Sequence, residues 1–178
     1  MKNLKFYFLI FPLFLLTILS SCAEKEKAED AYLLPFTEEK TDKWGFKNQA
    51  GEIIIPATQY DHCFSDTFKT YALVVKSNKF VAIDRKEKVM YTVFPFDNGP
   101  DYASEGLFRI IENGKVGFAD EKTGEIKIKP QFACAEPFEN GTSKVSFQCK
   151  IVKDGEHEIC ESDNWFCVDK NGKKVEAE

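Results

Sequence analysis

Cysteine and histidine are the residue types in this chain with the richest chemistry, and their spacing limits what they can do. The sequence contains six cysteines and two histidines. Cys149 and Cys160 lie symmetrically about Asp154-Gly155, and a two-residue turn there would place their Cα atoms about 5.5 Å apart, within disulfide range. We therefore predict a disulfide between Cys149 and Cys160 that closes a hairpin insertion at about residues 148–161.

A zinc site is another possible use of these side chains. The accepted structural set of three thiolates and one imidazole would come from Cys149, His157, Cys160 and Cys167. Side chains alternate along a strand, so His157 and Cys160, three residues apart, would point to opposite faces. His62 and Cys63 are neighbours in an extended segment and diverge in the same way, so they do not make a nucleophile pair. We expect neither a metal nor a cofactor.

Sequence patterns typical of catalysis or nucleotide binding are also missing. The chain has no Gly-x-Ser-x-Gly, Gly-x-Gly-x-x-Gly or P-loop pattern, and its carboxylates are scattered over turns as on a solvated surface. We expect a protein that is not an enzyme. The alternative is an enzyme or metal-dependent factor whose site combines distant turn carboxylates with His62 or His157.

Cys22 ends a segment that predicts export. Lys2 and Lys5 precede an apolar run over Phe6–Leu19, which is too short to cross a bilayer of about 30 Å comfortably. The run closes with Leu19-Ser20-Ser21-Cys22, the pattern at which bacterial lipoproteins are cleaved and lipidated. An ordinary signal peptide or an uncleaved anchor is the alternative.

The expected organisation follows from lipidation at Cys22. Residues 1–21 would be a removed signal peptide, residues 22–31 the lipidated cysteine and a polar, flexible tether, and residues 32–178 the folded domain. Fatty acyl chains such as palmitate would anchor the domain to a membrane of the bacterial cell envelope. No Asp directly follows Cys22, which favours the outer over the inner membrane.

The net charge argues against nucleic acid as a partner. Removal of residues 1–21 leaves 22 basic and 29 acidic side chains, a formal net charge of −7. Phosphate backbones are recognised mainly through clustered Lys and Arg, whereas the basic residues here are interspersed with acidic ones.

A repeated unit must position all of these side chains. Lys43–Asn48, Lys79–Asp84 and Lys115–Asp120 follow one another at intervals of 36 residues, and a fourth copy, Asn164–Asp169, arrives after 49. A fixed period of this size is typical of stacked structural repeats. The 13 extra residues before the fourth copy are the hairpin insertion predicted above.

Two columns of the repeat have predictable roles. An apolar side chain recurring once per unit is what stacked neighbours bury against each other, so we predict a repeat core formed by Trp44, Phe80, Val116 and Trp165. An exposed aromatic ladder that stacks on sugars is the alternative. The polar column is predicted to open a turn in each unit by bonding to the backbone, and comprises Asn48, Asp84, Asp120 and Asp169.

Turn signals between apolar runs predict the fold class. Asn113-Gly114 and Ser77-Asn78 separate pairs of apolar segments, as in tight hairpins, and Tyr32–Phe36 is predicted to pair with Lys43–Asn48. We expect an all-β fold, an array of antiparallel three-strand repeats of about 36 residues, stacked or partly curled. It would comprise three repeats and a partial fourth. Prolines are expected shortly after the third strands, and the aromatic residues that follow them are expected in the core: Pro56, Pro95 and Pro130, then Tyr60, Phe96 and Phe132.

The repeated residues resemble the WG-repeat family, also written KWG. The likeness rests on Lys43-Trp44-Gly45-Phe46, on Ser104-Glu105-Gly106-Leu107 before Lys115-Val116-Gly117-Phe118, and on Lys129–Gly141. The family is defined by pattern rather than by one activity, so the resemblance implies a β-rich repeat module and no catalytic residue.

These observations together favour a binding protein. We expect a cell-envelope lipoprotein whose non-catalytic β-repeat domain binds a protein or glycan partner. The second alternative, beside the enzyme, is a structural spacer within an envelope assembly.

Overall fold

The computed structural model describes residues 31–155 and 157–176. The predicted signal peptide, Cys22 and nearly all of the predicted tether lie outside these residues. The described part of the chain contains strands and turns without any helix, and every strand pairing in it is antiparallel. The predicted all-β class is therefore confirmed. This part of the chain also holds no helix long and apolar enough to cross a membrane.

Each repeat is a three-stranded meander. The first unit contains β1 (Leu34–Glu38), β2 (Lys43–Lys47) and β3 (Ile53–Tyr60), and the second contains β5 (Tyr71–Lys76), β6 (Lys79–Asp84) and β7 (Val89–Val93). The third contains β10 (Leu107–Glu112), β11 (Lys115–Asp120) and β12 (Ile126–Phe132), and the fourth β14 (Thr142–Ser146), β17 (Phe166–Asp169) and β18 (Lys174–Val175). As predicted, the strand before the first copy pairs with that copy, with Pro35 opposite Phe46.

Short strands carry the chain from one unit to the next. β4 (His62–Cys63) follows the first unit but pairs with β5 of the second, and β13 (Cys134–Ala135) follows the third unit but pairs with β14 of the fourth. β8 (Pro95–Phe96) and β9 (Gly99–Pro100) pair with each other between the second and third units. Strands β7 and β10 also pair, so the second and third units share one seven-stranded sheet.

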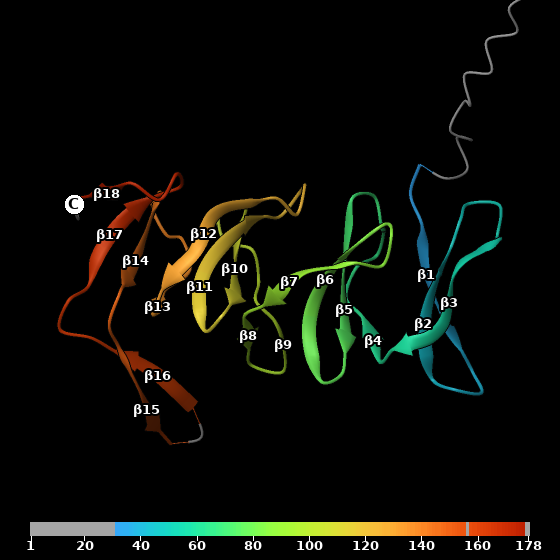
Figure 1. The fold of residues 1–178 in the computed structure, drawn as a ribbon, viewed down its shortest axis with the longest axis horizontal. Helices are drawn as coiled ribbons and strands as arrows, with labels where there is room; N and C mark the ends of the chain where they lie inside the picture. The colour runs from blue at the N-terminus through green and yellow to red at the C-terminus, as the bar shows by residue number, and fades with distance from the viewer. Residues whose placement is uncertain (1–30, 156, 177–178) are drawn as a thin grey trace, which may run out of the picture.

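The units follow one another along the long axis of the molecule in an elongated row (Figure 1). The apolar core is divided among the junctions between units. One buried cluster joins Phe46 and Tyr60 of the first unit to Val74 of the second, another joins Tyr91 to Phe108, and a third joins Phe118 to Val168. Each meander thus buries its apolar face against its neighbour, as expected for stacked repeats.

The predicted turn chemistry is confirmed in all four units. Asn48 Oδ1 accepts hydrogen bonds from the amides of Ala50 and Glu52 at 3.1 and 2.9 Å. The carboxylates at the equivalent positions belong to Asp84, Asp120 and Asp169. Each accepts a hydrogen bond from the amide two residues ahead and another from the amide three or four residues ahead, at 2.8 to 3.0 Å. The two predicted hairpin turns have positive φ at both central residues, Ser77-Asn78 and Asn113-Gly114, as type I′ turns require.

A β-bulge in the third strand explains the glycine of the repeat. The register between β2 and β3 jumps from Phe46 opposite Ile55 to Trp44 opposite Tyr60, so the extra residues of β3 bulge over Gly45. A Cβ on Gly45 would lie 2.5 Å from the Ile55 carbonyl oxygen and 2.7 Å from the Ala57 nitrogen. Only glycine therefore fits at this point.

The bulges also change two expectations about the segments that follow. Pro56 and Pro130 were expected after the third strands, yet they lie inside β3 and β12, where a bulge tolerates the missing amide hydrogen. Phe96 was expected in the core with Tyr60 and Phe132, but its side chain is 49% exposed. The shorter β7 has a smaller register shift and buries Val93 instead.

The predicted insertion forms an arm of two strands, β15 (Lys150–Asp154) and β16 (His157–Glu161), which projects from the row (Figure 1). Its predicted disulfide is wrong. Asp154 pairs with His157, so the turn lies one residue later than expected and Cys160 faces Ile151 rather than Cys149. Cys149 is bonded to Cys134 of β13 instead, with Cα atoms 6.2 Å apart.

Candidate binding groove

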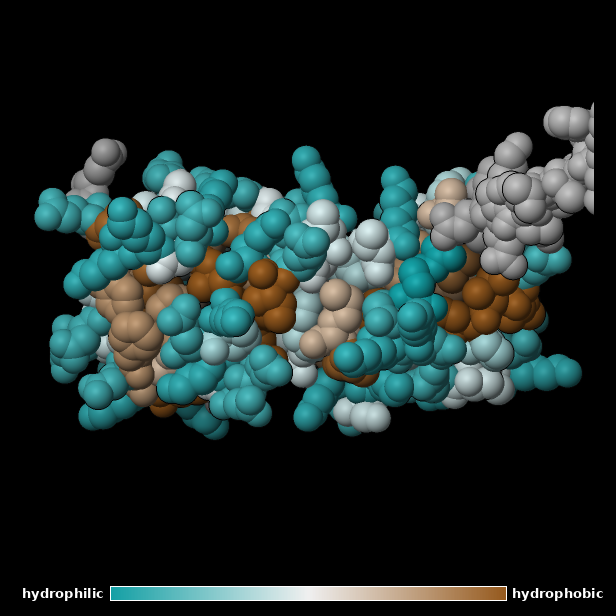
Figure 2. Space-filling view, turned by 45° about the horizontal axis from the view of Figure 1, so that its top comes forward, coloured by the Kyte–Doolittle hydropathy of each residue, from teal (hydrophilic) through white to brown (hydrophobic). Residues whose placement is uncertain are grey.

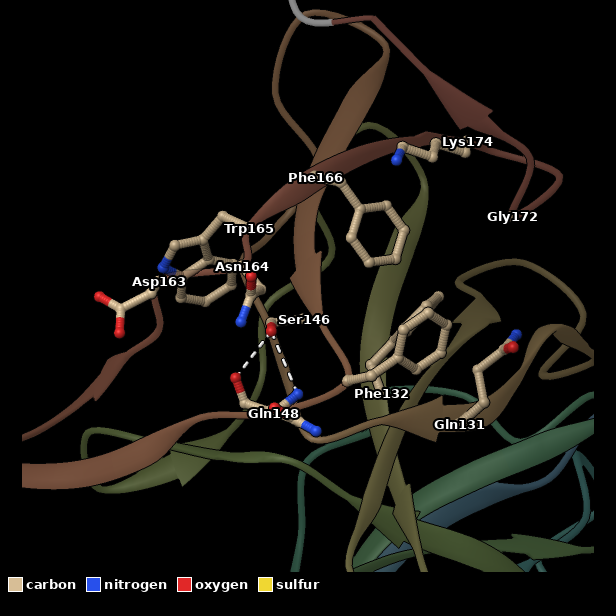
Figure 3. Close-up of a pocket in the computed structure, with 11 residues that line it drawn as sticks. Gln131, Phe132, Ser146, Gln148, Asp163, Asn164, Trp165, Phe166, Gly172 and Lys174 are labelled. Atoms are coloured by element: carbon tan, nitrogen blue, oxygen red, sulfur yellow. Dashed lines mark hydrogen bonds between the residues drawn. The ribbon is translucent and has the colours of Figure 1, made fainter.

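An open groove of about 720 Å³ lies at the junction of the third and fourth units. Its aromatic wall is formed by Phe132 at the end of β12 and Phe166 at the start of β17, both labelled in Figure 3, together with Phe147, which follows β14. The polar and remaining lining residues come from the loops beside these strands and comprise Gln131, Ser146, Gln148, Asp163, Asn164, Trp165, Gly172 and Lys174.

The three phenylalanine rings form one cluster. Phe147 lies 5.4 Å from Phe132 and 5.3 Å from Phe166 between ring centroids, and Phe132 lies 6.2 Å from Phe166. Phe132 is buried at the base, whereas the side chain of Phe147 is 54% exposed. The Lys174 ammonium is 5.3 Å from the Phe166 ring centroid. The groove therefore presents an exposed aromatic surface supported from below and flanked by a cation.

Serine hydroxyls hold the loop that carries Phe147. Ser146 Oγ donates to the Gln148 carbonyl oxygen at 2.7 Å, and Ser162 Oγ reaches the same oxygen at 2.6 Å. Ser162 Oγ also accepts the Asn164 amide at 3.0 Å. These bonds join the two chain segments that enter and leave the arm, so the groove rim is a fixed structure and not a pair of independent loops.

The predicted apolar column has mixed surroundings. Val116 is buried at 4% exposure within the third-unit cluster. Trp44 and Phe80 are partly buried and pack against core clusters from their edges, and Trp165 is partly buried and lines the groove. The column is thus buried at Val116 and partly buried at its other three members.

A second aromatic row crosses the first two units. His62 lies 5.1 Å from Trp44 and 4.7 Å from Phe64, and Phe64 lies 5.6 Å from Phe80, between ring centroids. Hydrophilic side chains cover most of the surface seen in Figure 2, where the apolar areas remain separate from one another. This aromatic row and the groove share no residue and lie in different units.

His62 and the turn carboxylates of the alternative active site do not come together among the described residues. His62 is exposed between aromatic rings, and the turn acids each accept amides of their own turn. Burial raises the pKa of the neighbouring Cys63 thiol to about 11, which disfavours its nucleophilic thiolate at neutral pH. The side chain of His157 lies outside the described part of the structure.

Sequence reasoning identified Trp165 but missed the groove around it. Phe147 and Gln148 belong to no repeated column, and they meet Phe132 only when the fourth unit stacks on the third. One signal was present: Phe147 directly precedes the 13 inserted residues, so an exposed aromatic residue marks the point where the period breaks.

The fold is an array of β-repeats with an open groove at a junction between units. The family model described as WG containing repeat matches residues 44–80 and 117–147, so the chain carries WG-containing repeats over these two stretches. No curated protein and no solved structure matches the chain. The first matched stretch runs from Trp44 to Phe80, one full period of the apolar column.

Proposed function

We propose that this chain is a bacterial cell-envelope lipoprotein whose β-repeat domain binds a glycan through the groove between its third and fourth units, without catalysis. The observation that carries the proposal is the exposed aromatic surface of Phe147 beside Trp165. An aromatic face packs against the apolar face of a sugar ring, and such burial contributes about 25 cal/mol per Å².

The polar lining supports a glycan over a purely apolar ligand. Gln131, Gln148 and Asn164 place side-chain amides around the rings, and an amide both donates and accepts hydrogen bonds, as a ring of sugar hydroxyls requires. Asp163 and Lys174 add one charge of each sign, so the groove is not tuned to a strongly anionic ligand.

Titration with envelope polysaccharides, followed by isothermal titration calorimetry, tests the binding proposal. Phe147→Ala and Trp165→Ala should each weaken glycan binding by at least about tenfold, as expected for exposed aromatic residues central to a site. The control is Tyr102→Ala, whose side chain is 73% exposed outside the groove. Equal affinities of all three variants would contradict the assignment. If the wild type and Tyr102→Ala capture an envelope protein that Phe147→Ala and Trp165→Ala do not, the partner of the groove is a protein and not a glycan.

Mass spectrometry of membrane-extracted protein tests the lipoprotein proposal separately. The lipobox sequence that ends at Cys22 predicts a mature chain that begins with an acylated Cys22. Cys22→Ala should release the protein from the membrane fraction. A mature soluble chain beginning at another residue, unaffected by Cys22→Ala, would overturn the anchor without affecting the groove.

A further inference from the structure

Three cysteine sulfurs meet at the base of the arm. Cys134 in β13 is buried, Cys149 directly precedes β15, and Cys160 in β16 is exposed. The ligand atoms of these residues all lie within 4.8 Å of one another. Cys134 and Cys149 form the disulfide, and Cys160 keeps a free thiol. The cluster joins the third unit to both strands of the arm.

We propose that Cys134, Cys149 and Cys160, once reduced, form a binding site for one Cu(I) ion. An ion about 2.3 Å from each of three sulfurs holds them about 4 Å apart, a spacing that the cluster reaches with small side-chain movements. Soft thiolate ligands favour Cu(I), Zn²⁺ and iron–sulfur clusters over harder metals. Because two of the three residues are on strands and the third adjoins one, the ligands approach from fixed directions.

The number of ligands favours copper over zinc. Structural zinc sites are almost always four-coordinate. Among the side chains that the structure describes, which leave out those of Asp154, His157 and Glu158, no fourth ligand atom of His, Cys, Asp or Glu joins the three sulfurs. The zinc set considered from the sequence contained Cys167, and this cysteine does not belong to the cluster. Three sulfurs without a fourth ligand suit a trigonal thiolate site.

The charged groups beside the cluster are compatible with an ion held by thiolates. Arg109 donates from Nη1 to the carbonyl oxygen of Ala135, next to Cys134, at 3.2 Å. Partial burial raises the pKa of the Cys160 thiol above its ordinary value; the charge of Arg109 opposes this shift and the charge of Glu136 adds to it. The arginine offsets part of the negative charge of a trithiolate, and the exposed Cys160 gives the ion a path from solvent.

The oxidation state of the site controls its occupancy. Reduction of the Cys134–Cys149 bond takes two electrons and two protons from a dithiol reductant, which becomes a disulfide itself, and yields two new thiols. Metal binding then releases the thiol protons to solvent. In the oxidised protein only Cys160 of the three cysteines is available as a ligand, so the disulfide excludes the ion. The base of the arm is therefore joined to β13 either by the disulfide or through the metal.

Anaerobic titration with Cu(I) in competition with a chromogenic chelator tests the site. Protein reduced with a phosphine should take up one ion that the oxidised protein leaves on the chelator, and X-ray absorption should show sulfur neighbours only. Cys160→Ser retains the disulfide cysteines and should fold as the wild type does, yet after reduction it should bind at least about 100-fold more weakly, since even changes to outer-shell partners cost about 10–100-fold.

Two controls separate this site from other thiols. Oxidised wild-type protein retains Cys63, Cys160 and Cys167 as thiols and should not compete with the chelator. Cys63→Ala, reduced, should bind as the wild type does. The proposal is overturned if the reduced wild type fails to compete, if Cys160→Ser binds with wild-type affinity, or if Zn²⁺ binds more tightly with a nitrogen or oxygen neighbour.

Discussion

Gly45→Ala tests the close approach of β2 and β3 that defines the repeat. The new Cβ would lie 2.5 and 2.7 Å from backbone atoms of Ile55 and Ala57, and 2.9 Å from the ring of Phe36. Two of these contacts are with backbone, which side-chain rotation cannot move away. Forced overpacking lowers the stability of the folded state by about 1–3 kcal/mol. Alanine also reduces the conformational entropy of the unfolded chain, which offsets about 0.4–1 kcal/mol of that loss. We expect a net loss of about 2 kcal/mol.

Thermal denaturation followed by circular dichroism measures this loss. At about 2–4 °C per kcal/mol for a domain of this size, Gly45→Ala should lower Tm by about 4–8 °C. Gly117→Ala should act in the same way, because a Cβ there would meet Pro130 nitrogen at 2.5 Å.

Gly99→Ala is the matched control. The nearest atom to its added Cβ is 3.9 Å away, in the Phe64 ring, so the stability should change by less than about 0.5 kcal/mol. Equal Tm values for Gly45→Ala and Gly99→Ala would refute the reasoning, because the bulge would then accommodate a side chain.

Three further predictions concern charge and the disulfide. In the wild type the buried Arg109 guanidinium lies 2.6 Å from the Asp101 carboxylate. Asp101→Asn leaves this guanidinium without a compensating charge and should lower the free energy of unfolding in urea by about 3–5 kcal/mol; an unchanged midpoint would contradict this. Cys149→Ser removes the disulfide to Cys134, which has a sequence separation of 15, and should lower the free energy of unfolding by about 3 kcal/mol. Non-reducing peptide maps should show this disulfide in the wild type and not in the variant. The amide of Thr123 holds the pKa of Asp120 below its usual range, so its stabilisation is present above the ordinary pKa of about 4 and lost as pH falls through the folded value. Asp120→Asn should therefore lose less stability than the wild type between about pH 4 and 2, and equal losses would argue against this turn.

Local chemistry was readable from the sequence wherever one short segment decides the outcome. The 36-residue spacing of Asn48, Asp84 and Asp120 predicted a turn in each unit, and the amides two to four residues ahead do bind these side chains. Asn113-Gly114 predicted a hairpin because both residue types tolerate the positive φ that a tight turn requires, and both do adopt it. Such features need no distant partner, so they follow from residue type and spacing.

Bulges and turn positions limited the prediction of strand register. Phe96 was expected in the core, but a smaller register shift in β7 left it at the surface. A one-residue difference in the arm turn moved Cys160 opposite Ile151 and ended its predicted pairing with Cys149. Side chains alternate with a period of two along a strand, so a slip of one residue changes every contact.

The sequence by itself determined the all-β class, the period and the turns of this protein, because each depends on residues close together in the chain. Only the tertiary structure decided which side chains meet between units. Stacking the fourth unit on the third brought Phe132 beside Phe147 and Phe166, and pairing of β13 with β14 brought Cys134 to Cys149 and Cys160. Contacts between units depend on how whole meanders bury their apolar faces, which no local spacing records.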